Sequence, residues 1–165
     1  MKINIKHLAQ AALFAALVAL CTLIQVPIGG EYIHAGDIFL YPAALLLPLP
    51  LGMVAGALGA GLVDVFSGFA IFAPATVVVK ALVVLGIGLL CRKRGGGLRW
   101  AGATAWSMVI TVVGYGAFVA IVTDGFSAAL AVAPFNALQG IVGAAAGIPI
   151  ALWLRRVQKR EIDRG

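Results

Sequence analysis

Apolar segments separated by short turn-like stretches fill almost the whole of this 165-residue chain. A membrane-spanning helix needs about 20 mainly apolar residues, so six spans would use about 120 residues and leave about 45 for loops and ends. Hydrophobic residues make up 62% of the sequence and charged residues 11%, against roughly 25% charged residues in a soluble domain. The sequence therefore predicts an all-α integral membrane protein with one domain over residues 1–165. It excludes a soluble enzyme, a disordered tail and a disulfide scaffold.

Glycine and proline residues indicate where the spans begin and end. Pro27 closes the first apolar run, Pro48 marks a tight turn, and Pro74 suits the first turn of a helix. The last span could begin near Ser127 with a kink at Pro134, or at Pro134 itself, and we expect the second because it gives a natural span length. The predicted spans cover residues 7–26, 38–47, 51–66, 74–91, 100–122 and 134–154, all approximately.

The basic residues identify one side of the membrane. All of the 12 Lys and Arg residues except Lys80 lie in the two ends of the chain or between the fourth and fifth spans. Four acids lie in the opposite loops or helix ends, namely Glu31, Asp37, Asp64 and Asp124. Because Lys and Arg collect on the cytoplasmic side, we expect a six-transmembrane-helix bundle with both termini cytoplasmic. No aromatic residues interleave with these charges, so nucleic acid is not an expected partner.

Catalytic and metal-binding motifs are missing from the sequence. It contains no HExxH motif, no nucleophile–histidine pair, no carboxylate pair at useful spacing and no Walker motif. We therefore expect no enzyme activity, no cofactor and no metal site, and any use of ATP must come from another chain.

Polar side chains within the predicted spans gather toward one face of the membrane. A channel or proton relay would need polar groups across the whole thickness of the membrane. Polar side chains confined to one face instead predict a binding cavity that opens to the outside. Aromatic rings could stack on a small ring-containing solute, and amide and charged groups could hydrogen-bond to it. The candidate residues are His34, Asp37, Lys80, Tyr115, Asn136 and Gln139.

Each candidate also has a purely structural interpretation, and the sequence leaves both open. Lys80 could form an ion pair with Asp64 or Asp37, since a lysine in a membrane needs a partner. The remaining alternatives are a solvated loop for His34, helix capping for Asp37 and Asn136, a bond to a neighbouring helix for Gln139, and packing for Tyr115.

Small residues form a stripe along the first predicted span. Ala11, Ala15 and Ala19 recur at every fourth position, and Ala12 and Ala16 add a second column beside them. Small residues allow helices in lipid to approach closely. The stripe is wider than one neighbouring helix needs, so the sequence leaves two interpretations open: a surface for a partner protein, or packing within the bundle.

Several short motifs together resemble a known family. A GD pair opens the second span, D-x-x-x-G closes the third, P-A-T-x-x-x-K opens the fourth and APFNALQG opens the last. With the Ala-x-x-x-Ala stripe, they resemble the substrate-binding S components of energy-coupling factor (ECF) vitamin transporters. The resemblance covers essentially the whole chain.

The resemblance implies a six-helix S component in a prokaryotic cell membrane that binds a water-soluble vitamin or precursor from outside. It implies association with a transmembrane T component, through Ala11, Ala15 and Ala19, and with two cytoplasmic ATPase subunits. It places Lys80, Tyr115, Asn136 and Gln139 in the solute pocket, with His34 and Asp37 from the first loop. Delivery would occur by toppling, in which the whole S component rotates in the membrane.

The substrate is less closely defined. The three tryptophans lie toward the inner side, where they fit an interfacial belt better than a stacking site, which lowers the case for thiamine. Few aromatics and one buried lysine favour a pyridoxine- or hydroxymethylpyrimidine-like ligand. A riboflavin- or thiamine-type S component stays open, as does a stand-alone homo-oligomeric transporter of small solutes.

Overall fold

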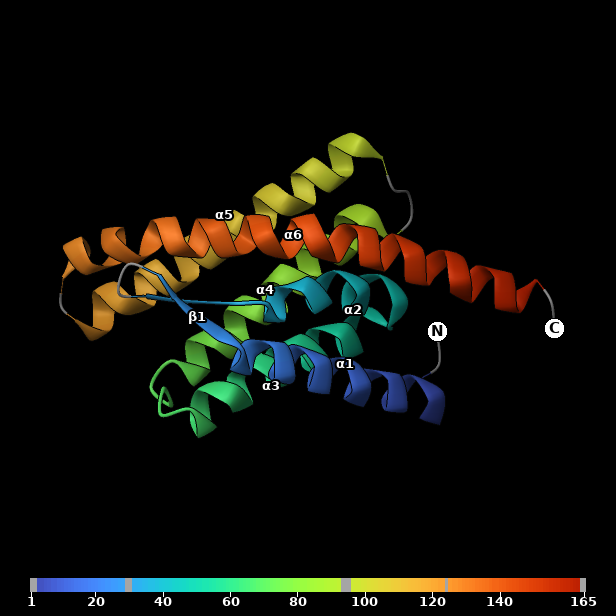
Figure 1. Cartoon of the computed structure of the whole chain (residues 1–165), viewed down its shortest axis with the longest axis horizontal. Coiled ribbons are helices and arrows are strands. Elements are labelled where there is room, and N and C mark those ends of the chain that lie inside the picture. The colour runs from blue at the N-terminus through green and yellow to red at the C-terminus, as the bar shows by residue number, and fades with distance from the viewer. Residues whose placement is uncertain (1–2, 29–30, 93–95, 124, 164–165) are drawn as a thin grey trace.

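The chain folds into a bundle of helices with one small hairpin (Figure 1). The computed structural model describes residues 3–28, 31–92, 96–123 and 125–163. Its elements are α1 (Ile5–Leu23), β1 (Gln25–Ile28), β2 (Glu31–His34), the 3₁₀ helix η1 (Gly36–Phe39), α2 (Leu40–Leu46), α3 (Leu49–Phe66), α4 (Ala73–Cys91), α5 (Gly97–Val122) and α6 (Phe126–Ile162). Within the described ranges, 5 helices are long and apolar enough to cross a membrane, and Gly36–Leu46 forms a shorter apolar helical run. The predicted all-helical class is confirmed.

Consecutive long helices pack side by side: α1 lies on α3, α3 on α4, α4 on α5 and α5 on α6. The start of α1 and the end of α6 lie at one end of the bundle, together with the end of α4 and the start of α5, and we call this the terminal end (Figure 1). The β1–β2 hairpin and the α3–α4 and α5–α6 connections lie at the other end, the hairpin end. Gly68 in the α3–α4 connection has φ +86°, a left-handed conformation that glycine adopts without steric cost.

The short helix α2 lies at the centre of the bundle, where it contacts α3, α4 and α6. Leu40, Ala43 and Ala44 are all 0% exposed. Glycines on the surrounding helices make room for it: a Cβ at Gly52 of α3 would lie 2.7 Å from the Ala43 carbonyl oxygen, and one at Gly147 of α6 would lie 2.8 Å from Tyr41 Cδ2. Because small residues let backbones approach closely, these glycines allow a half-length segment to be enclosed by protein.

Arginines satisfy helix carbonyls at the terminal end. The Arg92 guanidinium donates to the Leu47 carbonyl after α2, over 2.6 Å, and Arg155 of α6 donates to the Arg92 carbonyl after α4, over 2.9 Å. The last carbonyls of a helix have no partner within it, and a basic side chain there also interacts favourably with the helix dipole. The basic side chains therefore connect the ends of α2, α4 and α6.

The hairpin differs from the sequence prediction, which carried the first helix to residue 26 and left residues 31–37 as a loop. Helix α1 ends at Leu23, and β1 pairs antiparallel with β2, with Val26 opposite Ile33 and Pro27 opposite Tyr32. Pro27 cannot continue a helix because it lacks an N–H and clashes with the preceding turn. The β-branched residues beside it favour an extended strand.

The predicted start of the last span at Pro134 is wrong. Helix α6 begins at Phe126 and continues through both Pro134 and Pro149. Proline is tolerated in membrane helices because neighbouring helices and local adjustments satisfy the freed carbonyl, and α6 packs along α5. The helix also continues past residue 154, through a tail rich in the good helix formers Arg, Lys and Gln.

The close packing of α2 gives a direct test. Replacing Gly147 by alanine should destabilise the protein by about 1–3 kcal/mol, because the added methyl group overpacks the contact with Ile38 and Tyr41. The matched control is Gly102→Ala in α5, where the nearest atom to a new Cβ is 3.9 Å away. This change should be neutral or stabilising by up to about 1 kcal/mol. Chemical denaturation in detergent measures both, and equal effects would contradict the packing argument.

Candidate solute-binding site

A cavity of about 440 Å³ lies at the hairpin end of the bundle. Its walls come from the hairpin, the last turn of α3, the α3–α4 connection and the adjoining turns of α4, α5 and α6. The lining residues are Gln25, Tyr32, His34, Asp64, Phe69, Phe72, Thr76, Tyr115, Val119, Thr123, Ala128, Ala131, Val132, Asn136 and Gln139. Ligand pockets of this kind combine mostly apolar and aromatic walls with a few convergent polar groups.

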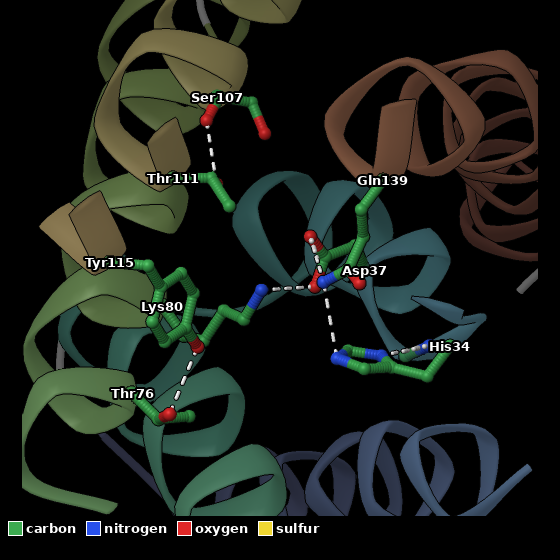
Figure 2. A network of polar contacts seen from close by, with 9 residues as sticks. His34, Asp37, Thr76, Lys80, Ser107, Thr111, Tyr115 and Gln139 are labelled. Atoms are coloured by element: carbon green, nitrogen blue, oxygen red, sulfur yellow. Dashed lines mark hydrogen bonds and ion pairs between the residues drawn. The ribbon is translucent and has the colours of Figure 1, made fainter. Parts of the chain in front are cut away.

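A buried ion pair lies beside this cavity. Lys80 Nζ of α4 lies 2.6 Å from Asp37 Oδ1 of η1, and the two side chains are 0% and 3% exposed. The Lys80 ammonium also lies 5.5 Å from the centroid of the Tyr115 ring (Figure 2). Both charges are therefore used within the protein. Neither residue belongs to the cavity lining.

Gln139 of α6 connects the ion pair to the cavity. Its amide nitrogen lies 3.4 Å from Asp37 Oδ2 and 3.1 Å from His34 Nε2, and Figure 2 shows the side chain between them. His34 Nδ1 in turn accepts a hydrogen bond of 3.2 Å from the Gly36 N–H. Gln139 thus links α6, η1 and β2 at the cavity wall.

The His34 ring is neutral in this environment. Burial and the Lys80 charge lower the pKa of His34 from 6.5 to about 4, against the opposing attraction of Asp37. The backbone contact agrees with this, since Gly36 N–H needs an unprotonated Nδ1. The neutral ring then carries its proton on Nε2, which faces the side-chain amide of Gln139.

A second polar chain runs along the opposite wall. The Tyr115 hydroxyl donates to Thr76 Oγ1 over 2.9 Å, as drawn in Figure 2. The Thr76 hydroxyl lies close to the Asp64 carboxylate, and Asp64 Oδ2 is shielded from solvent with no hydrogen-bond partner. Aromatic pairs border the cavity: Tyr32 lies 6.2 Å from Phe69 between ring centroids.

The structure brings four of the six predicted solute-binding residues to the cavity: His34, Tyr115, Asn136 and Gln139. Asp37 and Lys80 lie beside it, bonded to each other. The sequence argument left Thr76 out of the site. Its position one helical turn before Lys80, on the same face of α4, was a usable signal.

The small-residue stripe of α1 is divided between two surroundings. Ala11 is buried against the core, and Ala15 and Ala19 are half-buried at its flank. Ala12 and Ala16 are exposed. The smooth surface that remains open therefore lies to one side of the predicted stripe.

Comparison with known proteins identifies the family. A sequence model described as ECF-type riboflavin transporter, S component, matches residues 2–156. The chain belongs to this family. The comparison with curated proteins returned no match. This S component is thus a multi-pass membrane protein of a vitamin transporter, in a family of transport proteins rather than enzymes.

The ion pair of the S component should be costly to break from one side. Lys80→Met leaves the Asp37 charge buried without a partner, which should destabilise the protein by about 3–5 kcal/mol. Adding Asp37→Asn should recover a large part of the loss. Lys6→Met, which changes an exposed lysine of α1 in the same way, is the control. Thermal unfolding in detergent measures the stability of the wild type, the two single variants and the double variant. Equal losses of stability for Lys80→Met and Lys6→Met would argue against the ion pair.

The neutral His34 predicts a pH effect on stability. Below pH 6.5 the unfolded chain binds a proton at His34 that the folded protein does not bind until about pH 4. The free energy of unfolding should therefore fall by about 1.4 kcal/mol per pH unit over this window as the pH is lowered. His34→Gln should lose this pH dependence. The difference in free energy of unfolding between the wild type and the variant should therefore change by about 2 kcal/mol from pH 7 to pH 5. Parallel curves for the two proteins would show that His34 titrates normally.

Proposed function

We propose that this S component binds a small, uncharged or cationic heterocyclic vitamin or precursor in the cavity at the hairpin end. One observation carries the proposal: in the described part of the chain, neutral polar groups, aromatic rings and one carboxylate line the cavity, without a lysine or arginine. A carboxylate or phosphate ligand would need a cationic partner. Lys80, the buried lysine of α4, is already paired with Asp37 at 2.6 Å.

The lining suits recognition of a flat, polar-edged ring. Tyr115, Phe69 and Phe72 provide aromatic faces, and Asn136 and Gln139 can donate and accept hydrogen bonds at the ring edge. A pyridoxine- or hydroxymethylpyrimidine-like molecule has this chemistry. In this proposal His34 and Gln139 contact the ligand, while Asp37 and Lys80 hold the wall in place.

The membrane arrangement supports import from the outside. We propose that η1 and α2 count as a sixth, half-length membrane segment and that the basic terminal end is cytoplasmic, in the plasma membrane of a prokaryote. The cavity then faces outward. The terminal end is closed by the buried residues of α2 and by the Arg92 and Arg155 caps, which supports delivery by rotation of the whole protein rather than through a pore.

Energy for this rotation must come from partner chains. We propose that a transmembrane T component docks on the open small surface of α1, at Ala12, Ala16 and the half-buried Ala15 and Ala19. Ala11 supports this surface from inside, through its packing against the core. Two ATPase subunits would bind the T component on the cytoplasmic side.

A ligand panel tests the binding function. Purified wild-type protein in nanodiscs, without ATP, should bind at least one of pyridoxine, hydroxymethylpyrimidine, thiamine or riboflavin, and none of biotin, pantothenate or folate, by isothermal titration calorimetry. Asn136→Ala should weaken that binding about tenfold, the value of one lost hydrogen bond of roughly 1.4 kcal/mol. The exposed Gln158→Ala is the control. A folded protein that binds nothing in the panel, or binds only the carboxylates, would refute the proposal.

Co-purification tests the docking surface. Ala16→Trp should abolish association with a co-expressed T component while leaving ligand affinity unchanged, because bulk at this position keeps the helices apart. Leu89→Trp, on an exposed position of α4, is the matched control and should still associate. Ligand uptake by liposomes containing the S component alone would instead support a stand-alone homo-oligomeric transporter.

A further inference from the structure

Asp64 is the one acidic residue among the described residues that line the cavity. It lies in the last turns of α3, which ends at Phe66, and is half-buried. Its Oδ2 atom is shielded from solvent and has no hydrogen-bond partner within the described chain. A carboxylate charge at a mainly apolar cavity wall is costly without a cationic partner. The structure gives Asp64 no ion pair within the described chain, so this charge at the cavity wall points to a ligand.

The surrounding groups do not neutralise this carboxylate. The Tyr115 hydroxyl donates to Thr76 Oγ1, which leaves the Thr76 proton free for the Asp64 carboxylate nearby. One hydroxyl can serve only one of the two carboxylate oxygens fully. The Lys80 ammonium acts on Asp64 only from a distance, because its short contact of 2.6 Å is with Asp37.

The side chains of the cavity wall indicate which kind of hydrogen-bond donor on a ligand would fit beside Asp64. Carboxylates bind most strongly to charged or polarised N–H groups, which give shorter and stronger hydrogen bonds than neutral donors. Tyr115, Phe69 and Phe72 belong to the same lining, and aromatic faces attract cations as well as flat rings. A protonated or amino-substituted nitrogen heterocycle satisfies both features together.

We propose that Asp64 is the specificity-determining residue of the site and pairs through its carboxylate with an N–H donor of the ligand, an amino group or a protonated nitrogen on an aromatic heterocycle. The inference rests on the proposed function and narrows its substrate class. The site then favours an amine over an alcohol at the same position of the ring and rejects a carboxylate there by charge repulsion.

Matched ligands separate this role from simple packing. Wild-type protein should bind pyridoxamine more tightly than pyridoxine, and aminopyrimidine (4-amino-5-hydroxymethyl-2-methylpyrimidine) more tightly than its 4-hydroxy counterpart. Asp64→Asn keeps the size and one oxygen acceptor but removes the charge. It should weaken binding of the amino ligand at least about tenfold, while the affinity for the hydroxyl counterpart should change less than about twofold.

Two controls keep the test decisive. Asp163→Asn removes an exposed carboxylate at the terminal end and should leave the affinities for the amino ligands and for their hydroxyl counterparts unchanged. The ligand-free Asp64→Asn protein should melt at the wild-type temperature or higher, since the variant loses a carboxylate charge that has no ion pair in the described chain. If Asp64 had only a structural role, the substitution would lower the melting temperature. Unchanged preference for the amine in Asp64→Asn, or a lowered melting temperature with a parallel loss of both ligands, would overturn the inference. Those results would leave the proposed function standing. Wild-type protein that binds no member of the vitamin panel would overturn both.

Discussion

The contact between Lys80 and Asp37 holds together the part of the bundle on which the cavity depends. Both side chains are almost completely removed from solvent, so each would be very costly without the other. Asp37 fixes η1, Lys80 fixes α4, and Gln139 of α6 and the Tyr115 ring of α5 complete their surroundings. The hairpin is attached to the same network through His34. One buried pair thus positions elements that are far apart in the sequence around a common centre.

In this arrangement the charged Lys80–Asp37 pair is separate from most of the groups that face the cavity. The lysine and aspartate are consumed in holding the wall, and the groups left facing the cavity are amides, hydroxyls, a neutral imidazole and Asp64. Neutral groups can exchange water for a ligand at little electrostatic cost, since no buried charge must be freed first. The Asp64 carboxylate is the charged group that faces the cavity.

Much of this could be predicted from the sequence, because lipid imposes simple rules. The apolar runs predicted the long helices, and depth along them brought His34, Tyr115, Asn136 and Gln139 into one candidate site. The need of Lys80 for a partner was also evident, but the choice between Asp37 and Asp64 depends on how α3 and η1 approach α4 in three dimensions. The extension of α6 through Pro134 depends on support from α5, and the enclosure of α2 depends on glycines of other helices, so local patterns could not show either.

The helices of this protein differ greatly in length. At 1.5 Å per residue, the 37 residues of α6 extend for about 55 Å, whereas the helical run Gly36–Leu46 extends for about 17 Å. The hydrocarbon core of a bilayer is about 30 Å thick. The part of α6 before its basic tail, residues 126–154, alone extends for about 44 Å and is too long for this core when upright, whereas α2 is enclosed by the other helices. Tilting of α6 or local thickening of the bilayer accommodates a helix of this length. Bilayer thickness therefore acts as a thermodynamic variable for this protein: a change in lipid chain length alters the free energy of every orientation that the molecule adopts in the membrane.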